Sequence, residues 1–307
     1  MADNTIHEQA RWDCLRINIL LEIFETLNLI DRCTIAQVSH SWRMASLDSS
    51  LWRTIDLQIL WSDLIRVDTE IRLSQALTTM VAYGQGNITC IVFHPNLPTK
   101  DEHLGIIGRG CPHLKRLVMP CWDSISVTAM SDAINNWGEL ESITMPSLTP
   151  SFRAMLTIDG SCERFSQLKI VGVIHDGFLS SPFGIFPVEL KVLSLQCCLV
   201  PLGGLLAIMD MHLHLEVLNL SHVLLYLDER MNPMPLMKLF DNPVGMLILE
   251  KAFRLSSFFY CADYESCSEC NRMMAGRTRH SDEWWRLDEV ASLNLGMGEK
   301  DHSYISS

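Results

Sequence analysis

Three cysteines and one histidine near the carboxyl end of the chain are the residues whose types and spacing could do chemistry. Cys267 and Cys270 form a Cys-x-x-Cys pair, and Cys261 or His280 could supply a further ligand. Tetrahedral zinc requires paired ligands on a tight turn, so one pair with loosely spaced partners is weak support for a metal site. A redox role would need a strand-to-helix setting that this segment does not indicate. We therefore expect reduced, unligated cysteines and no cofactor.

No other motif predicts an enzyme. The chain contains no Gly-x-x-x-x-Gly-Lys-Ser/Thr loop, no His-Glu-x-x-His motif and no Gly-x-Ser-x-Gly turn. Histidines and carboxylates do not converge on one predicted element, although residues distant in sequence can meet in space. We expect a protein that binds other molecules and does not catalyse a reaction.

Composition narrows the class of partner. Hydrophobic residues make up 48% of the 307 residues and charged residues 20%, which argues against disorder. The net charge of -12 disfavours nonspecific binding to nucleic acid or to an anionic membrane. The polar amino terminus lacks the pattern of a secretory signal, and no apolar run approaches the roughly 18 residues of a membrane span. We expect a location in the nucleus and/or cytoplasm, where the 11 cysteines stay reduced.

Residues 10–57 predict three short helices. One stripe of the first helix is apolar and contains Leu15, Ile19, Leu20, Ile23, Phe24 and Leu27. Asp31 is expected to cap the second helix, and Ser39 to cap a third helix that carries Trp42. Three helices of this size cannot bury a large core, so the unit must pack against the rest of the chain or against a partner.

This segment resembles an F-box. The matching features follow a fixed order: Leu15, the apolar helix through Ile19, Ile23 and Phe24, then Leu29, the run from Val38 to Arg43, and Leu51-Trp52. Arg16 departs from the pattern, because F-boxes usually carry there a proline that begins the first helix and contacts the adaptor. The resemblance implies docking to the Skp-type adaptor of a Skp–cullin–F-box ubiquitin ligase through Leu15, Ile19, Leu20, Ile23, Phe24, Leu29, Val38 and Trp42. A helical cap without a docking role is the alternative.

From residue 88 onward the pattern apolar-x-x-apolar-x-apolar recurs six times. The motifs begin at Ile88, Leu114, Leu140, Leu168, Leu190 and Leu215, with offsets of 26, 26, 28, 22 and 25 residues. These offsets are typical of leucine-rich repeats, whose units of about 20–29 residues bury their apolar sides only by stacking. The predicted fold class is therefore α/β, with an amino-terminal three-helix F-box followed by a short right-handed leucine-rich-repeat arc that has a parallel inner sheet.

Side chains alternate along a strand, so the third and fifth positions of each motif are expected to face the concave surface. The substrate-binding residues predicted in this way are Arg116, Val118, Ser142, Thr144, Ile170, Val192, Ser194, Val217 and Asn219. This surface is mixed and nearly uncharged, and it could fit a protein segment or a small molecule. At the ninth position, where such repeats often carry Asn or Cys to bond the turn backbone, only Cys198 matches.

The predicted organisation has five parts: a tail (1–9), the F-box (10–57), a connecting helix (58–87), about six repeats (88–250), and a carboxyl-terminal cap and tail (251–307). Nearly the whole chain resembles plant F-box/leucine-rich-repeat proteins. The resemblance implies a non-catalytic substrate receptor that binds a Skp-type adaptor, through it a cullin, and a protein substrate. A repeat scaffold without a link to ubiquitin and a receptor assisted by a small molecule are the alternatives.

Overall fold

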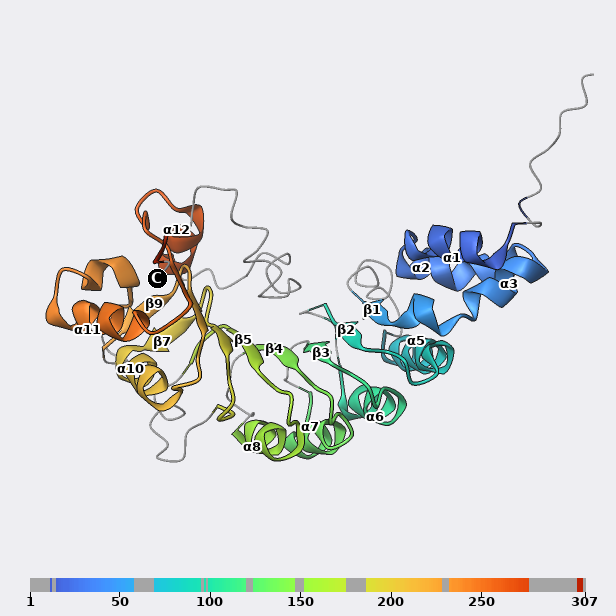
Figure 1. Cartoon of the computed structure of the whole chain (residues 1–307), viewed down its shortest axis with the longest axis horizontal. Helices are drawn as coiled ribbons and strands as arrows, with labels where there is room; N and C mark the ends of the chain where they lie inside the picture. The colour runs from blue at the N-terminus through green and yellow to red at the C-terminus, as the bar shows by residue number, and fades with distance from the viewer. Residues whose placement is uncertain are drawn as a thin grey trace, which may run out of the picture.

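The structure is a computed structural model that describes residues 12, 15–57, 69–94, 97, 99–119, 124–146, 152–174, 186–227, 232–275 and 303–305. The described residues form an arc, with short helices at one end and a long sheet along its inner side (Figure 1). None of the helices in these ranges combines the length and the hydrophobicity that crossing a membrane requires.

The amino-terminal unit consists of short helices with well-defined caps. Its elements are α1 (Ile17–Glu25), α2 (Leu29–Thr34), η2 (Ile35–Gln37), α3 (His40–Ser46) and η3 (Ser49–Trp52). Ser39 caps α3 as predicted, because its side chain accepts a hydrogen bond from the Trp42 backbone N–H at 3.2 Å. The prediction for α2 is wrong, because α2 begins before Asp31. Asn28 is its cap, and the Asn28 Oδ1 atom accepts from the Asp31 N–H at 2.9 Å.

One aromatic pair and one arginine hold these helices together. Phe24 is fully buried, and its ring meets that of Trp42 edge to face with centroids 5.1 Å apart. The Arg32 guanidinium donates to the Phe24 carbonyl at the end of α1 and to the Leu51 carbonyl in η3. Because one side chain satisfies carbonyl groups of two elements, it fixes α1, α2 and η3 relative to one another.

The inner sheet has nine strands in the order β1-β2-β3-β4-β5-β6-β8-β11-β12. They are β1 (Thr54–Asp56), β2 (Cys90–Val92), β3 (Arg116–Val118), β4 (Ser142–Pro146), β5 (Gln167–Val171), β6 (Val192–Ser194), β8 (Val217–Leu220), β11 (Ser257–Tyr260) and β12 (Ser303–Ile305). All neighbours from β1 to β11 pair in parallel, and β12 pairs with β11 in the antiparallel direction. The predicted parallel inner sheet is thus confirmed.

A smaller sheet and a row of helices complete the arc. The smaller sheet contains β7 (Leu199–Pro201), β9 (Leu224–Tyr226) and β10 (Met234–Pro235). The remaining helices are α5 (Thr69–Gly84), α6 (Asp101–Gly110), α7 (Val127–Ile134), α8 (Phe152–Ser161), α10 (Leu202–Met211), η4 (Leu236–Leu239), α11 (Pro243–Ala252) and α12 (Ser268–Met274). Helices α5 to α8 lie side by side on the outer side of the arc (Figure 1). A Cβ atom on Gly108 would lie 3.1 Å from the Ala133 Cα, so glycine permits the close approach of α6 and α7.

Strand register corrects the fourth repeat motif. Leu168 pairs with Ile143 on one side and Leu193 on the other, and therefore occupies the fourth position of its motif. The motif begins at Phe165, not at Leu168, and the offsets between first positions become 26, 26, 25, 25 and 25 residues. The apolar pattern around β5 fits either starting residue, so the sequence could not decide between them. Pairing with β4 and β6 allows only one register, because a shift by one residue would turn every side chain to the other face.

The repeat pattern also extends into the segment that resembles an F-box. Ile55 in β1 pairs with Ile91 in β2, so Trp52, Ile55 and Leu57 occupy the first, fourth and sixth motif positions. All three side chains are at most 1% exposed. The division into five parts stays a prediction, and residues 276–302 and 306–307 of the expected carboxyl-terminal cap and tail lie outside the described residues.

Candidate functional site

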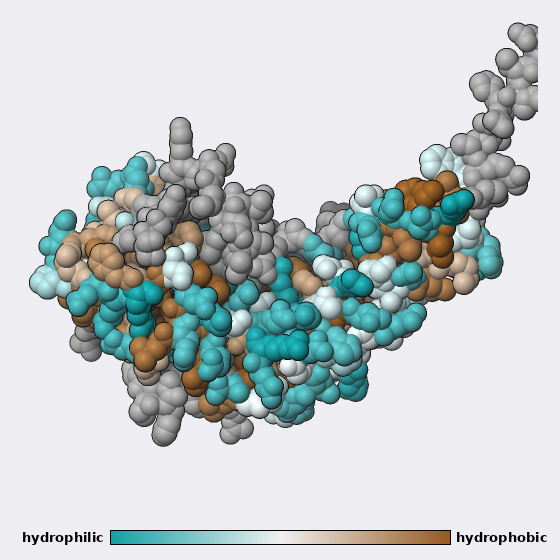
Figure 2. All heavy atoms as spheres, in the orientation of Figure 1, coloured by the Kyte–Doolittle hydropathy of each residue, from teal (hydrophilic) through white to brown (hydrophobic). Residues whose placement is uncertain are grey.

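Apolar side chains remain accessible on the amino-terminal helices. Val38 is 61% exposed and Ile19 is 39% exposed, whereas Leu15, Ile23 and Trp42 are half-buried. Ile19 and Ile23 are four residues apart in α1 and therefore share one helix face. Figure 2 shows apolar residues gathered over these helices. Accessible apolar side chains that share one face are a candidate surface for another molecule.

The other predicted adaptor contacts are interior. Leu20, Phe24 and Leu29 are at most 6% exposed and pack in the core of the helical unit. In this structure they position the accessible residues and do not themselves form the surface. Three further apolar side chains of this unit are exposed and were not among the predicted contacts: Ile17, Met44 and Leu47, at 53%, 52% and 38%. Ile17 lies off the apolar stripe of α1, and Met44 and Leu47 belong to α3 and its end, so their exposure follows only from the folded unit.

Arg16 holds the backbone conformation of the proline that it replaces in the F-box pattern. Its φ of -65° is the value that a proline ring imposes, and its ψ is 146°. Its carbonyl oxygen accepts from the N–H groups of Ile19 and Leu20 at 3.0 and 3.1 Å, which begins α1. The helix therefore starts at the expected place without the proline.

The concave face is more buried than the sequence predicts. Arg116, Ser142 and Val217 are half-buried, whereas five of the predicted contacts are at most 7% exposed: Val118, Thr144, Val192, Ser194 and Asn219. Asn219 shapes the chain as well, because its Oδ1 atom accepts from the Ser221 N–H at 2.9 Å in the turn after β8. A bound segment would therefore contact chiefly the half-buried residues.

The corrected register changes one predicted contact. Ile170 is 0% exposed and belongs to the apolar core, so its assignment to the concave face is wrong. Gln167 and Lys169 take the third and fifth positions of that repeat, with Lys169 paired beside Thr144 and Ser194. The sequence shows this lysine, but only the strand register reveals which face it belongs to.

A shallow hollow lies on the concave face between β3 and β6. Its lining consists of Arg116, Ser142, Ile143, Thr144, Gln167, Leu168, Lys169 and Val192. Two of these residues are cations and none is a carboxylate, which corrects the expectation of a nearly uncharged surface at this point. Lys169 is 4% exposed and Arg116 is half-buried, so Arg116 is the more accessible positive group of the hollow.

Cys198, the ninth residue of its repeat, bonds to the backbone as expected for that position. Its thiol is 0% exposed and donates to the Ile170 carbonyl of the neighbouring repeat at 3.0 Å. Burial raises the pKa of this thiol to about 12, so it stays protonated and can donate. None of the nine cysteines in the described residues forms a disulfide.

A second group of polar side chains gathers at the carboxyl end of the sheet. His222, Cys261, Cys267 and Cys270 are buried, and their potential ligand atoms all lie within 4.8 Å of one another. We call these four residues the Cys3His cluster. Hydrogen bonding with Cys270 holds the pKa of Cys261 below its ordinary value and raises the pKa of Cys270. The cluster thus favours at least one thiolate.

The fourth member of the cluster differs from the expected candidate. His280 lies outside the described residues, and His222 fills the position beside the three cysteines. His222 follows β8 and Cys261 follows β11, and these strands pair in parallel through Leu220 and Tyr260. The carboxyl ends of paired parallel strands lie at one edge of the sheet, which brings the two residues together. Spacing along the chain carries no such signal.

Comparisons with known proteins agree with this architecture. A family model described as F-box-like matches residues 17–58. The F-box/LRR-repeat protein At3g48880 of Arabidopsis thaliana is 32% identical over 301 residues, which cover 93% of this chain and 96% of the relative. The chain belongs to the plant F-box/LRR-repeat family. Another Arabidopsis thaliana relative, named as the F-box protein At4g11580, is 24% identical over 95% of this chain and 99% of its own length.

The family match and the sheet overlap in this F-box/LRR-repeat protein. Residues 17–58 include the whole of β1, so the F-box region ends inside the sheet that carries the repeats. F-box domains generally bind Skp-type adaptors and are generally non-catalytic subunits. The predicted fold class and family are confirmed.

Proposed function

We propose that this protein is the substrate-recognition subunit of a Skp–cullin–F-box ubiquitin ligase. Its F-box helices dock the Skp-type adaptor, and through it a cullin, while the concave face binds the protein to be ubiquitinated. The observation that carries the proposal is the pairing of β1 with β2, which makes the F-box region and the repeats parts of one sheet. A rigid receptor holds its cargo at a fixed place relative to the enzyme that the ligase recruits, and so raises the effective concentration of substrate lysines there.

The adaptor contact is assigned to the accessible apolar residues of the F-box. Ile19 and Ile23 form its centre because they share one face of α1, and Val38 extends it toward α3. Burial of such side chains at an interface gives most of the favourable free energy of association. The buried contact between Phe24 and Trp42 packs α1 against α3. The relative position of the exposed residues on these helices therefore depends on this core contact.

The substrate contact is assigned to the hollow between β3 and β6. The half-buried Arg116 favours an acidic segment, and the half-buried Ser142 and Gln167 add hydrogen-bonding groups beside it. Charge complementarity of this kind selects partners and speeds their association more than it increases affinity. The proposed substrate is therefore a protein with an exposed acidic stretch.

The proposal requires no catalytic group in this chain, because the ligase assembly supplies the ubiquitin-transfer chemistry. It also places the protein in the nucleus or cytoplasm, where the resemblance to plant F-box receptors implies that the ligase acts.

Co-purification with a Skp-type adaptor tests the docking surface. The full chain should retain the adaptor, whereas the double variant Ile19→Asp with Ile23→Asp should lose it and keep folded repeats, as judged by circular dichroism and thermal unfolding. The control is Leu213→Asp with Phe253→Asp, which changes side chains that are 72% and 68% exposed outside the F-box. The control should retain the adaptor.

Two results would contradict the proposal. If the unaltered chain binds no adaptor, the protein is a repeat scaffold without a ligase role. If the Ile19/Ile23 variant retains the adaptor as well as the control does, the docking surface is assigned to the wrong residues.

A further inference from the structure

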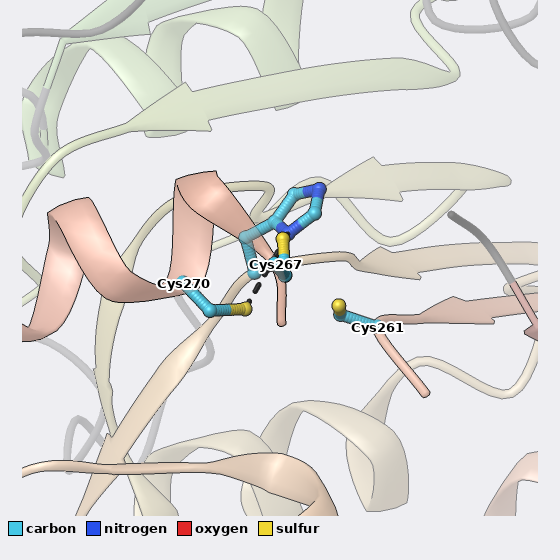
Figure 3. A group of neighbouring side chains, drawn as sticks. Cys261, Cys267 and Cys270 are labelled. Atoms are coloured by element: carbon cyan, nitrogen blue, oxygen red, sulfur yellow. Dashed lines mark hydrogen bonds between the residues drawn. The ribbon is translucent and has the colours of Figure 1, made fainter. Parts of the chain in front are cut away.

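The Cys3His cluster joins three segments that are far apart in the sequence. His222 lies in the turn between β8 and β9, Cys261 directly follows β11, and Cys267 and Cys270 lie at the start of α12. All four side chains are at most 9% exposed. In Figure 3 the sulfur atoms of Cys261, Cys267 and Cys270 point into one common space.

The distances within the cluster match those around one metal ion. The Nδ1 atom of His222 lies 3.2 Å from the Cys267 sulfur and 3.5 Å from the Cys270 sulfur. Zn–S bonds of about 2.3 Å and a Zn–N bond of about 2.0 Å in a tetrahedron separate neighbouring donor atoms by roughly 3.5–3.8 Å. Four donors within 4.8 Å of one another therefore need only small shifts to reach this geometry.

The types of the donor atoms select the metal. Three thiol groups and one imidazole form the Cys3His set of structural zinc sites, in which the protein fills all four positions. Sulfur ligands in a tetrahedral arrangement disfavour magnesium and calcium, which prefer oxygen. No carboxylate belongs to the cluster.

Other buried cysteines of this protein have a different environment. Cys111 and Cys162 each lie singly in the apolar core of the repeats, where a cysteine acts as a small hydrophobic residue. Cys261, Cys267 and Cys270 instead pack against one another, with the ring of Tyr264 beside them. Core filling does not require three thiol groups to surround an imidazole nitrogen.

The backbone around the cluster is also held in a demanding conformation. His222 has a φ of 58°, in the left-handed region that residues with a Cβ atom rarely adopt. The Asn219 side chain supports this turn through its hydrogen bond to the Ser221 N–H. Cys197, which lies one 25-residue repeat earlier, has nearly the same φ of 56°, so this conformation belongs to the repeat turn, and it places His222 at the edge of the sheet beside the three cysteines.

We propose that His222, Cys261, Cys267 and Cys270 bind one Zn²⁺ ion in a closed, structural site. Through the Nδ1 atom of His222 and the three sulfur atoms, the ion links α12 to the turn between β8 and β9. Helix α12 has only seven residues and buries only Cys270 and Met273, so it is too short to be stable by itself. The ion therefore fixes the carboxyl-terminal cap of the arc, at the end opposite to the F-box helices (Figure 1).

Metal counting on the full chain tests the proposal directly. The protein is purified without chelators from zinc-supplemented cells, and its metal content is measured by inductively coupled plasma mass spectrometry. We expect one zinc per chain. A chain that holds no stoichiometric zinc, both as purified and after reduction and addition of Zn²⁺, overturns the proposal, as does a disulfide between Cys267 and Cys270 in the freshly purified chain.

Variants identify the ligands. His222→Ala, and Cys267→Ser combined with Cys270→Ser, should lose the zinc, whereas Cys111→Ser and Cys162→Ser should retain it because these buried cysteines lie in the repeat core. Zinc that persists in the ligand variants, or that is lost equally in the controls, overturns the assignment. These counts do not depend on adaptor binding, so the zinc site and the proposed ligase function can fail separately.

Spectroscopy on the unaltered chain covers the case in which the ligand variants fail to fold. Replacement of zinc by Co²⁺ should give a thiolate-to-metal charge-transfer band and the visible absorption of a tetrahedral ion. X-ray absorption of the zinc form should show three sulfur neighbours at about 2.3 Å and one nitrogen at about 2.0 Å. A spectrum of six oxygen or nitrogen neighbours would mean adventitious binding and would overturn the proposal.

Discussion

Trp52 packs against Tyr83, with the centroids of their rings 4.9 Å apart. Trp52 ends η3 of the F-box region, and Tyr83 belongs to α5, the first helix on the outer side of the repeats. The Trp52 indole N–H also donates to the Ser46 carbonyl at 3.0 Å. One buried side chain thus connects the helices of the F-box region to the arc.

Replacing this tryptophan should weaken the whole chain. Trp52→Ala leaves a cavity between η3 and α5 and removes the donor to the Ser46 carbonyl, so we expect the free energy of unfolding to fall by about 3–5 kcal/mol. Urea unfolding followed by circular dichroism measures this loss. The control is Trp12→Ala, because Trp12 is 60% exposed and its change should stay within about 0.5 kcal/mol. Equal losses in the two variants would contradict the structural role.

Arg16→Pro should stabilise the F-box. The φ of Arg16 already equals the proline value, so the substitution mainly restricts the unfolded chain and should raise the free energy of unfolding by about 0.4–1 kcal/mol. The resemblance to other F-boxes implies that adaptor affinity rises as well, which calorimetric titration with the adaptor measures. Glu22→Pro, inside α1, is the contrasting change and should cost about 3 kcal/mol. A loss of stability in Arg16→Pro would show that the start of α1 needs the arginine.

The repeats and the F-box could be predicted from sequence because both depend on local periodicity. The spacing of apolar residues places each strand near its neighbour, and Ser39 caps α3 as its position before an apolar helix indicates. Periodicity cannot decide between two positions for the start of a repeat when both fit the apolar pattern. Phe165 and Leu168 can both begin a repeat, and only pairing of Leu168 with Ile143 and Leu193 decides between them.

The candidate metal site shows what local patterns cannot supply. The Cys-x-x-Cys pair at Cys267 was visible in the sequence, but His222 comes to it through the pairing of β8 with β11. Because β8 and β11 are far apart in the sequence, local patterns could not predict that they pair in the sheet. The sequence also could not show which apolar residues of the F-box are exposed. Leu20 and Phe24 have the same apolar character as Ile19 and Ile23, but they are buried in the core.

The hollow on the concave face should prefer acidic peptides. Arg116→Met keeps much of the aliphatic stem and removes the charge of the half-buried cation of the hollow, so we expect the affinity for a fluorescent glutamate-rich peptide to fall about tenfold, or about 1.4 kcal/mol. Fluorescence anisotropy measures this change. Arg109→Met removes an equal charge from the exposed side of α6 and should leave the affinity unchanged. If the peptide binds no better than a lysine-rich peptide of equal length, the hollow is not an acidic-segment site.

Acid should destabilise the protein through His212. This side chain is 4% exposed, and neither of its ring nitrogens has a hydrogen-bond partner within the described residues. Burial, together with the nearby Arg254 charge, lowers the pKa of His212 below its ordinary value of 6.5, and Asp159 offsets this only in part. The unfolded chain therefore binds a proton more readily than the folded chain. The stability that neutral His212 contributes is complete above about pH 6.5 and is lost as the pH falls toward the folded-state pKa.

A leucine at this position isolates the contribution of His212 from those of the other histidines. His212→Leu keeps an apolar side chain against Phe186, whose ring meets that of His212 with centroids 5.7 Å apart. The slope of unfolding free energy against pH should then be smaller than in the unaltered chain by up to about 1.4 kcal/mol per pH unit below about pH 6.5. Urea unfolding at a series of pH values measures both slopes. Parallel curves for the two proteins would mean that His212 accepts its proton equally well in the folded and unfolded chains, and would exclude it as the acid-sensitive group.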